Sequence, residues 1–294
     1  MENKRNILVS IIIPFYNRSD LLINCVNSIT KNTFNNYEII LIDDGSEEKH
    51  SSIAKKLISD NIYYYKLNKN YERGYARNFG ANKSNGNYLN FFDSDDICLD
   101  NHVKETTNFI KKYNFPELFS HSHMLLSSKR LTKKKHIGIL NKKINNNNCV
   151  SCNSIVIRKD IFLNNKFSEN RLLSGSEDWD LWLRLSMNFN IYSNPIFTSI
   201  IIDHDDRSMR SQNLSTIIKR LDNLILRIQN KKIYNYQKLN LSKVFSEIYS
   251  FKSFTLSSNK SFKYESLKYL LKSIFRAISP NLLNQIIICF LQLF

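Results

Sequence analysis

The sequence contains no run of about 18 uninterrupted apolar residues, which is the length that a membrane-spanning helix requires. It also begins without the features of a secretion signal, because Met1–Asn6 is charged and Ile7–Pro14 is too short for the apolar segment before a cleavage site. Cysteine is scarce, and its five residues are scattered rather than spaced as a disulfide framework. We therefore expect a chain that lies in the reducing cytoplasm and does not cross a membrane.

Acidic residues are few for the number of basic ones, which leaves a net charge of +16. The excess is uneven: residues 215–294 contain 13 Lys and Arg against 3 Asp and Glu, which gives +10 for this segment. Ser127–Cys149 adds seven basic residues and no acidic one. This distribution favours an anionic surface partner, either a membrane or a nucleic acid. The alternative is a solvated lysine-rich surface without a partner.

Three missing patterns exclude other kinds of site. Cys149-Val-Ser-Cys152 has no second pair to complete a zinc site, so we interpret these cysteines as lining a strand, with a redox or metal role as the alternative. Pro14–Arg18 is not the glycine-rich basic loop that a nucleotidyltransferase would place after its first strand. Aromatic residues follow helical patterns rather than alternating with Lys and Arg on a strand, which argues against RNA binding. We expect no nucleic-acid partner.

What is present is a regular alternation of strands and helices over the first hundred residues. Four apolar runs read as buried strands: Ile7–Ile13, Tyr37–Ile42, Ile62–Leu67 and Tyr88–Phe92. Helical patterns separate them, at Ser19–Ile29 (with Ser19 as N-cap), Glu47–Ser59 and Arg73–Ser84. Alternation at this spacing predicts βαβ units and a mainly parallel sheet.

The pattern is less regular after the fourth strand. We expect a helix at Asn101–Tyr113, a strand at Leu118–Leu126, a basic asparagine-rich loop at Ser127–Asn148, a strand at Val150–Arg158, a helix beginning at Glu177, an extended segment at Ile191–Ile202, and helices from Ser215 onward. A chain of 294 residues is long enough for one large domain, or for one domain with an appendage.

Carboxylates gather where the predicted strands end. Asp43 and Asp44 follow the second strand, and Asp93, Asp95 and Asp96 follow the fourth. Such groups repel one another and resist desolvation, so a hard divalent cation with oxygen ligands is the usual partner. The carboxyl ends of strands are also where open α/β sheets bind ligands. The alternative is that Asp95 or Asp96 caps a helix starting near Leu99.

Five motifs occur together: Val-Ser-Ile-Ile-Ile-Pro-Phe-Tyr-Asn, Asp-Asp-Gly-Ser, Gly-Tyr-Ala-Arg-Asn, Phe-Asp-Ser-Asp-Asp and Glu-Asp-Trp-Asp-Leu-Trp-Leu-Arg. In this order, over about residues 7–210, they resemble the inverting family 2 glycosyltransferases with the GT-A fold. The resemblance implies a Rossmann-like α/β sheet, mainly parallel and flanked by helices, with a C-terminal helical extension. The last 80 residues match nothing specific.

The resemblance also implies roles on the donor side. It assigns Asp93-Ser94-Asp95 to the metal and the ribose, with Asp95 as the direct ligand of Mn²⁺ or Mg²⁺, and Asp44 to the base or ribose. His204 would complete the metal coordination or contact the diphosphate, and a plain polar histidine is the alternative. Arg77 would approach the diphosphate or bind an acidic neighbour. The remaining residues expected to contact the nucleotide sugar are Pro14, Tyr16 and Asn17.

Direct displacement at the anomeric carbon needs a base that accepts the proton of the acceptor hydroxyl. The resemblance assigns that role to Asp178, with Glu177 as second choice; capping of the helix that they begin is the alternative. On the same helix we expect Trp182 to be a core residue and Arg184 to pair with an acidic residue of the site. For the histidines at positions 121 and 123 we expect no metal role, because no third ligand is near.

We therefore expect a catalytic domain at residues 1–210, with a nucleotide half at about 1–100 and an acceptor half at about 101–210. Residues 211–294 would form a basic helical region. There Lys263, Lys268, Lys272 and Arg276 follow one stripe of a helix beside an apolar stripe that runs from Leu267 to Ile278, and the apolar Leu282–Phe294 is too short to span a bilayer. An anionic membrane surface is the expected partner of this region, and packing on the protein is the alternative.

The function implied is metal-dependent transfer of a sugar from a nucleoside-diphosphate sugar, with UDP expected, to a hydroxyl of a glycan or lipid-linked acceptor. The setting would be bacterial surface polysaccharide synthesis, peripheral to the inner face of the cell membrane. The alternative is a catalytically inactive protein of the same pathway that binds nucleotide sugars or assists assembly.

Overall fold

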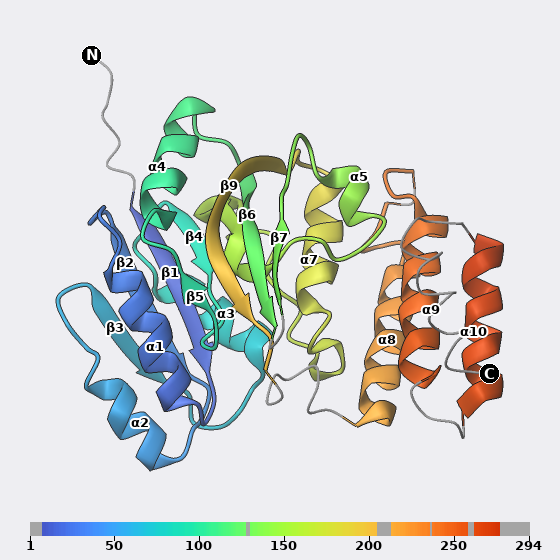
Figure 1. Ribbon diagram of the computed structural model, residues 1–294, viewed down its shortest axis with the longest axis horizontal. Coiled ribbons are helices and arrows are strands. Elements are labelled where there is room, and N and C mark those ends of the chain that lie inside the picture. The colour runs from blue at the N-terminus through green and yellow to red at the C-terminus, as the bar shows by residue number, and fades with distance from the viewer. Residues whose placement is uncertain (1–7, 128–129, 205–212, 236, 258–261, 277–294) are drawn as a thin grey trace.

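In the computed structural model, residues 8–127, 130–204, 213–235, 237–257 and 262–276 are described (Figure 1). Their strands form one nine-stranded sheet in the order β3-β2-β1-β4-β8-β6-β9-β5, with β7 paired to β6 outside this path. The first four strands are parallel to one another, whereas β8 and β5 run antiparallel to their neighbours. The predicted α/β class with a mainly parallel core is confirmed.

The first half follows the predicted alternation closely. Its elements are β1 (Val9–Phe15), α1 (Ser19–Thr30), β2 (Tyr37–Asp43), α2 (Glu48–Lys55), β3 (Ile62–Lys66), α3 (Arg73–Lys83) and β4 (Tyr88–Phe91). Because the strands are parallel, the carboxyl ends of β1, β2 and β4 meet at one edge of the sheet.

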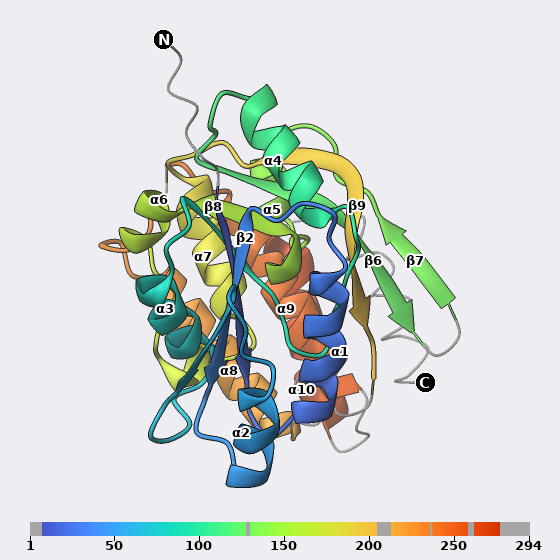
Figure 2. The same cartoon turned by 90° about the vertical axis from the view of Figure 1, so that its left-hand side faces the viewer.

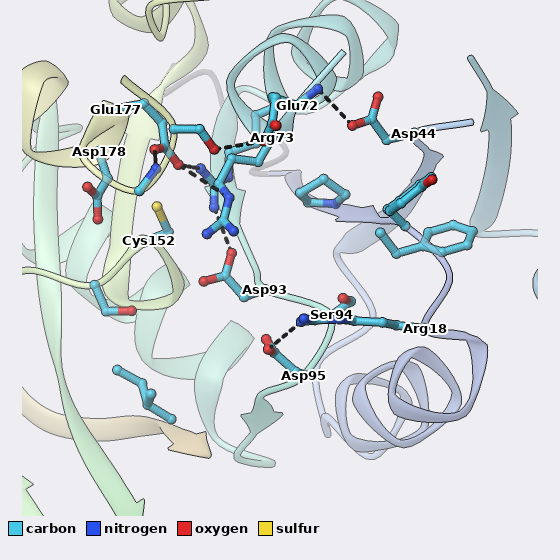
Figure 3. Close-up of a pocket in the computed structure, with 18 of the residues that line it drawn as sticks. Arg18, Asp44, Glu72, Arg73, Asp93, Ser94, Asp95, Cys152, Glu177 and Asp178 are labelled. Atoms are coloured by element: carbon cyan, nitrogen blue, oxygen red, sulfur yellow. Dashed lines mark hydrogen bonds and ion pairs between the residues drawn. The ribbon is translucent and has the colours of Figure 1, made fainter. Parts of the chain in front are cut away.

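The second half contains shorter elements and the long curved strand β9. They are β5 (Ile97–Cys98), α4 (His102–Lys112), β6 (Leu118–Ser127), β7 (Arg130–Lys134), α5 (Asn141–Ile144), the 3₁₀ turn η1 (Cys152–Ser154), β8 (Ile155–Arg158), α6 (Lys159–Leu163), the 3₁₀ turn η2 (Arg171–Leu173), α7 (Glu177–Ser186) and β9 (Tyr192–Ile202). The first residues of α7 stand near the edge where β4 ends (Figure 3).

Both faces of β1 and β2 are buried, which explains why most of their residues are apolar. Ile12 packs on the side of α3, α6 and α7 in one core, whereas Ile11 and Ile13 pack with α1 and α4 in a second core. Figure 2 shows α3, α6 and α7 on one side of β1 and β2, and α1 on the other. The sheet edge between these layers is therefore held rigidly.

Four predictions about local structure are wrong. Ser19 is the first residue of α1 rather than its cap, and its hydroxyl bonds His50 Nδ1 at 2.9 Å. Helix α2 ends at Lys55, before the predicted residue 59, because the chain then turns into β3. The predicted loop at residues 127–148 contains β7 and α5, since Ile144 is a core residue. The predicted strand from Val150 begins only at Ile155, after η1.

Three helices follow β9: α8 (Leu214–Ile228), α9 (Leu241–Ser257) and α10 (Lys263–Arg276). Leu221 and Leu224 of α8 belong to the same core as Trp182 of α7, so the first of these helices extends the hydrophobic core of the sheet. Figure 1 shows α9 beside α8 and α10 outermost. Within the described ranges, no helix combines the length and apolar character needed to cross a membrane. The predicted apolar stretch at residues 282–294 lies outside these ranges.

Candidate active site

A pocket of about 740 Å³ opens where β1, β2 and β4 end, a volume in the range of small-ligand sites. In Figure 3, Asp178 and Glu177 lie on one side of it, Asp44 and Arg18 on the other, and Asp93 between them. Of the predicted site residues, the structure brings the following to the lining: Pro14, Tyr16, Asp44, Arg77, Asp93, Ser94, Asp95, Glu177 and Asp178. Asn17 and His204 are not among the lining residues.

Asp93, Asp95 and Asp96 each offer a carboxylate oxygen, and these oxygens lie within 4.8 Å of one another. Asp96 is buried, and its oxygens accept hydrogen bonds from Asn153 Nδ2 at 2.6 Å and from the Ile202 amide at 2.8 Å. Asp96 therefore ties the turn after β4 to η1 and to the end of β9, while Asp93 and Asp95 line the pocket. The alternative of a helix cap is wrong for both Asp95 and Asp96, because β5 follows them and α4 begins only at His102.

Asp95 lies at the centre of a polar cluster. Its Oδ2 accepts from Arg18 Nη1 at 3.1 Å, and His204 Nε2 lies 3.1 Å from the same oxygen. His204 follows the end of β9, so it reaches the pocket edge from the opposite half of the sheet. The carboxylate oxygens of Asp93 and Asp95 suit Mn²⁺ or Mg²⁺, while His204 lies beside Asp95 and outside the group of three carboxylates that could share one ion.

Arg77 takes the second of its two predicted roles, as the partner of acidic neighbours. It is buried and bridges two elements: Nη1 donates to Glu177 Oε1 at 2.8 Å, and Nη2 donates to Asp93 Oδ1 at 2.7 Å. Its guanidinium also lies 5.2 Å from the centroid of the Phe167 ring. Arg77 therefore fixes Asp93 relative to the start of α7, and a contact with the diphosphate stays a prediction.

The two carboxylates that begin α7 have different surroundings. Glu177 is buried, and its oxygens accept from Arg77 and from the Gly175 amide. Asp178 is partly exposed to the pocket, where Oδ2 accepts from Asn148 Nδ2 at 3.0 Å. Burial and the charge of Glu177 raise the pKa of Asp178 to about 6, against the effect of the Asn148 hydrogen bond. Asp178 is thus the carboxylate that can exchange a proton with a ligand.

At the ends of β1 and β2, the side chains of Asn17 and Asp44 accept hydrogen bonds from backbone amides. Asp44 accepts from the amides of Tyr71 and Glu72 at 2.8 and 2.9 Å, and burial raises the pKa of Asp44 to about 6. Asn17 Oδ1 accepts from the Glu47 amide at 2.9 Å, which ties the loop after β1 to the loop after β2. Gly45 permits the close approach of the loop after β3, because a Cβ at position 45 would lie 2.4 Å from the carbonyl carbon of Lys69.

Several other predictions about side chains are settled by their contacts. Trp182 is fully buried in the core, as expected. Arg184 pairs with an acidic residue, but this is Asp180, which is buried beneath α8 and does not line the pocket. His121 bonds Thr106 Oγ1 at 2.9 Å, and of the two strand histidines only His123 reaches the pocket.

Cys149 and Cys152 line the pocket and belong to no strand, because Cys149 precedes η1, Cys152 is the first residue of η1, and β8 begins only at Ile155. The interpretation of these cysteines as strand residues is therefore wrong. Among the described residues, the candidate metal cluster contains no cysteine.

Sequence reasoning missed several lining residues that come from different elements. They include Arg18, Arg73, Asn148, Arg171 and Arg220. The place of Arg18 directly after the Pro-Phe-Tyr-Asn motif was a usable signal. The other four depend on how distant loops and α8 pack, for which the sequence carries no local sign.

Comparisons with known proteins agree with this geometry. The family model described as glycosyl transferase family 2 matches residues 10–163. An uncharacterized glycosyltransferase of Rickettsia bellii is 32% identical over 192 residues, covering 62% of this chain and 27% of that protein. The glycosyltransferase GlyG of Streptococcus pneumoniae is 34% identical over 99 residues, 33% of each chain. The chain thus spans only 27% to 31% of the first three relatives, all from Rickettsia.

Solved structures share the fold at low identity. TarS 1–349 of S. aureus, in complex with UDP-GlcNAc, has a TM-score of 0.70 at 18% identity, covering 92% of this chain and 82% of that one. The mannosyltransferase PcManGT of Pyrobaculum calidifontis, in complex with GDP-Man and Mn²⁺, has a TM-score of 0.61 at 10% identity, covering 97% of this chain and 80% of that one. Together with the family match over more than half of the chain, they show that this protein belongs to glycosyl transferase family 2 and has a GT-A-like fold.

Proposed function

We propose that the protein is a metal-dependent inverting glycosyltransferase that uses a nucleoside-diphosphate sugar, with UDP as the expected nucleotide. The observation that carries this proposal is the placement of Asp178 in the same pocket as the Asp93 and Asp95 cluster. A base and a charge-stabilising cluster on two sides of one pocket suit displacement at an anomeric carbon held between them. The neighbours that bind UDP-GlcNAc and GDP-Man support a nucleotide-sugar donor.

Each part of the site then has a role. Pro14, Tyr16 and Asp44 border the space for the base and ribose. A divalent cation held by Asp93, Asp95 and His204 would stabilise the negative charge that develops on the leaving diphosphate. Asp178 accepts the proton of the acceptor hydroxyl as that oxygen attacks the anomeric carbon, and Asn148 keeps its carboxylate oriented.

The proposal is tested by measuring release of nucleoside diphosphate across a panel of sugar donors, with Mg²⁺ or Mn²⁺ and with chelator. We expect metal-dependent release from at least one uridine donor, and slow transfer to water suffices for detection. The absence of release from every donor, with normal nucleotide binding, would favour the catalytically inactive alternative. The intact carboxylates and the unblocked Asp178 argue against that alternative.

We further propose that the enzyme works at the cytoplasmic surface of a bacterial membrane, on a glycan or lipid-linked acceptor in surface polysaccharide synthesis. The outermost helix supports this, because α10 leaves Tyr264, Leu267, Leu271 and Phe275 exposed at 77, 41, 46 and 86%. The predicted basic stripe is partly used within the protein: Lys272 lies over the rings of α9, as does Arg276, while Lys268 is exposed. An apolar stripe flanked by cations suits an anionic bilayer.

We expect the full chain to co-sediment with anionic vesicles at low salt and the double variant Leu271→Ser, Phe275→Ser to lose most of this binding. Both side chains are exposed, so the substitutions remove apolar contact with lipid without opening the core. Attraction of about 1 kcal/mol per basic residue near the surface should weaken as salt rises. The matched control is Leu226→Ser, an exposed leucine on α8. Equal vesicle binding by the double variant, or a stable dimer in sedimentation velocity that the double variant loses, would contradict the membrane proposal.

A further inference from the structure

Three arginines from separate parts of the chain meet at one end of the pocket. Arg73 begins α3, Arg171 begins η2, and Arg220 lies in α8, which packs against η2. All three line the pocket. The catalytic pocket therefore includes a cation supplied by the C-terminal helices, beyond the segment that the family model matches.

The nearby carboxylates are already engaged. Glu72 Oε1 pairs with Arg171 Nη2 at 3.3 Å, and its other oxygen accepts from Ser174 Oγ at 2.7 Å. Glu177 Oε1 accepts from Arg77 at 2.8 Å and lies 3.8 Å from Arg73 Nε. The second oxygen of Glu177 accepts from the Gly175 amide. Each oxygen of these two carboxylates therefore already has a donor other than Arg220.

Arg220 is the unusual member of the group. Its Nη1 atom is buried and has no hydrogen-bond partner among the residues that the structure describes. Burial lowers the pKa of the Arg220 guanidinium against the opposing charges of Glu72 and Glu177, and the positive charges of Arg73 and Arg171 act in the same direction as burial. A desolvated donor beside two like charges is unfavourable unless an anion satisfies it, and a guanidinium suits phosphate or carboxylate oxygens.

The location of this group indicates which substrate carries the anion. In the proposed function the donor diphosphate lies at Asp93 and Asp95, where a divalent cation balances its charge. Arg220 is instead within electrostatic reach of Glu177, the neighbour of the proposed base Asp178. The acceptor hydroxyl must lie within hydrogen-bond reach of that base, so groups attached to the acceptor extend toward this end of the pocket.

We propose that Arg220, with Arg73 and Arg171, binds a phosphate or carboxylate group of the acceptor, so that the sugar is transferred to an anionic acceptor. This inference rests on the proposed function, since it takes Asp178 as the base and Asp93 and Asp95 as the diphosphate site. Arg220 acts as a specificity-determining residue that selects acceptors by charge.

The test uses the full chain saturated with UDP and Mg²⁺, into which glycerol 3-phosphate is titrated by calorimetry, with glycerol as the neutral probe. We expect glycerol 3-phosphate to bind and glycerol not to bind. Arg220→Gln should weaken the binding by about tenfold or more, as expected for loss of a charged hydrogen bond. Arg220→Lys should recover part of it. Lys219→Gln removes the same charge from an exposed neighbour and should have no effect.

Each other outcome has a distinct meaning. If wild type binds UDP with Mg²⁺ but not glycerol 3-phosphate, or if Arg220→Gln binds that probe normally, the anion site is refuted while the donor site stands. If Arg220→Gln instead weakens UDP binding, the arginine belongs to the donor diphosphate and the acceptor inference fails. If the wild-type chain binds no nucleoside diphosphate, the proposed function itself fails. Thermal melting of each variant identifies a loss that is due to unfolding.

Discussion

Asp178→Asn is expected to lower sugar transfer by about 10²-fold or more, the usual scale of general-base catalysis, while leaving donor affinity nearly unchanged. The substitution keeps the shape of the side chain, and its one amide oxygen can still accept from the Trp179 amide. Its NH₂ group can donate to the Asn148 side-chain oxygen once the Asn148 amide turns over, because Asn148 donates to Asp178 in the wild-type chain. It removes only the ability to accept a proton at neutral pH. Transfer rates with saturating donor, and nucleoside-diphosphate affinity by calorimetry, measure the two quantities separately.

Glu177→Gln provides the comparison, because the neighbouring carboxylate is bound to Arg77 and the Gly175 amide. Gln offers one acceptor oxygen to these two donors and no charge to the buried guanidinium, so the variant should lose thermal stability, unlike Asp178→Asn. The pH profile gives a second check. Since the pKa of Asp178 is raised to about 6, wild-type transfer should fall as the pH drops below about 6 and the carboxylate becomes protonated. Near-normal transfer by Asp178→Asn would move the base elsewhere, and Glu177 would be the next candidate.

The parts of the fold that were predictable are those with a continuous local signal. Tyr88–Phe91 is apolar enough to require burial on both faces, and the acidic residues after it mark where the strand leaves the core. By contrast, β7 and α5 lie in a basic, asparagine-rich segment with few apolar residues. Leu140 and Ile144 anchor α5 in the core, but two apolar positions in a polar segment do not define a helix before its packing partners are known.

The residues of the candidate site were also predictable only where a local sequence motif marks them. Residues inside strand-end and helix-start motifs were found, because their position in the element already points them to the sheet edge. Asn148 and Arg220 were not, because each reaches the pocket through tertiary packing. Asp96 belongs to the same acidic motif as Asp93 and Asp95, but the motif alone does not reveal its structural role. Its carboxylate accepts hydrogen bonds from Asn153 and from the Ile202 amide and so joins separate parts of the sheet.

Asp95→Ala is expected to remove the metal dependence of nucleotide binding. In the wild-type chain, Asp95 contacts both His204 and Arg18, so it is the residue through which a cation would join the two halves of the sheet. With Mn²⁺ present, UDP should bind wild type at least about tenfold more tightly than it does with chelator, because the cation neutralises the diphosphate. In Asp95→Ala, the affinities with Mn²⁺ and with chelator should be equal and low.

Asp100→Ala is the matched control for this experiment, since it removes an exposed carboxylate close in sequence but outside the pocket lining. It should bind UDP and Mn²⁺ as wild type does. Asp96→Ala is unsuitable, because losing its bonds to Asn153 and Ile202 would weaken the sheet itself. The measurement is calorimetric titration of UDP into wild type, Asp95→Ala and Asp100→Ala, each with Mn²⁺ and with chelator. Equal UDP affinity of wild type and Asp95→Ala under both conditions, with UDP bound measurably, would show that nucleotide binding does not use a cation at Asp95.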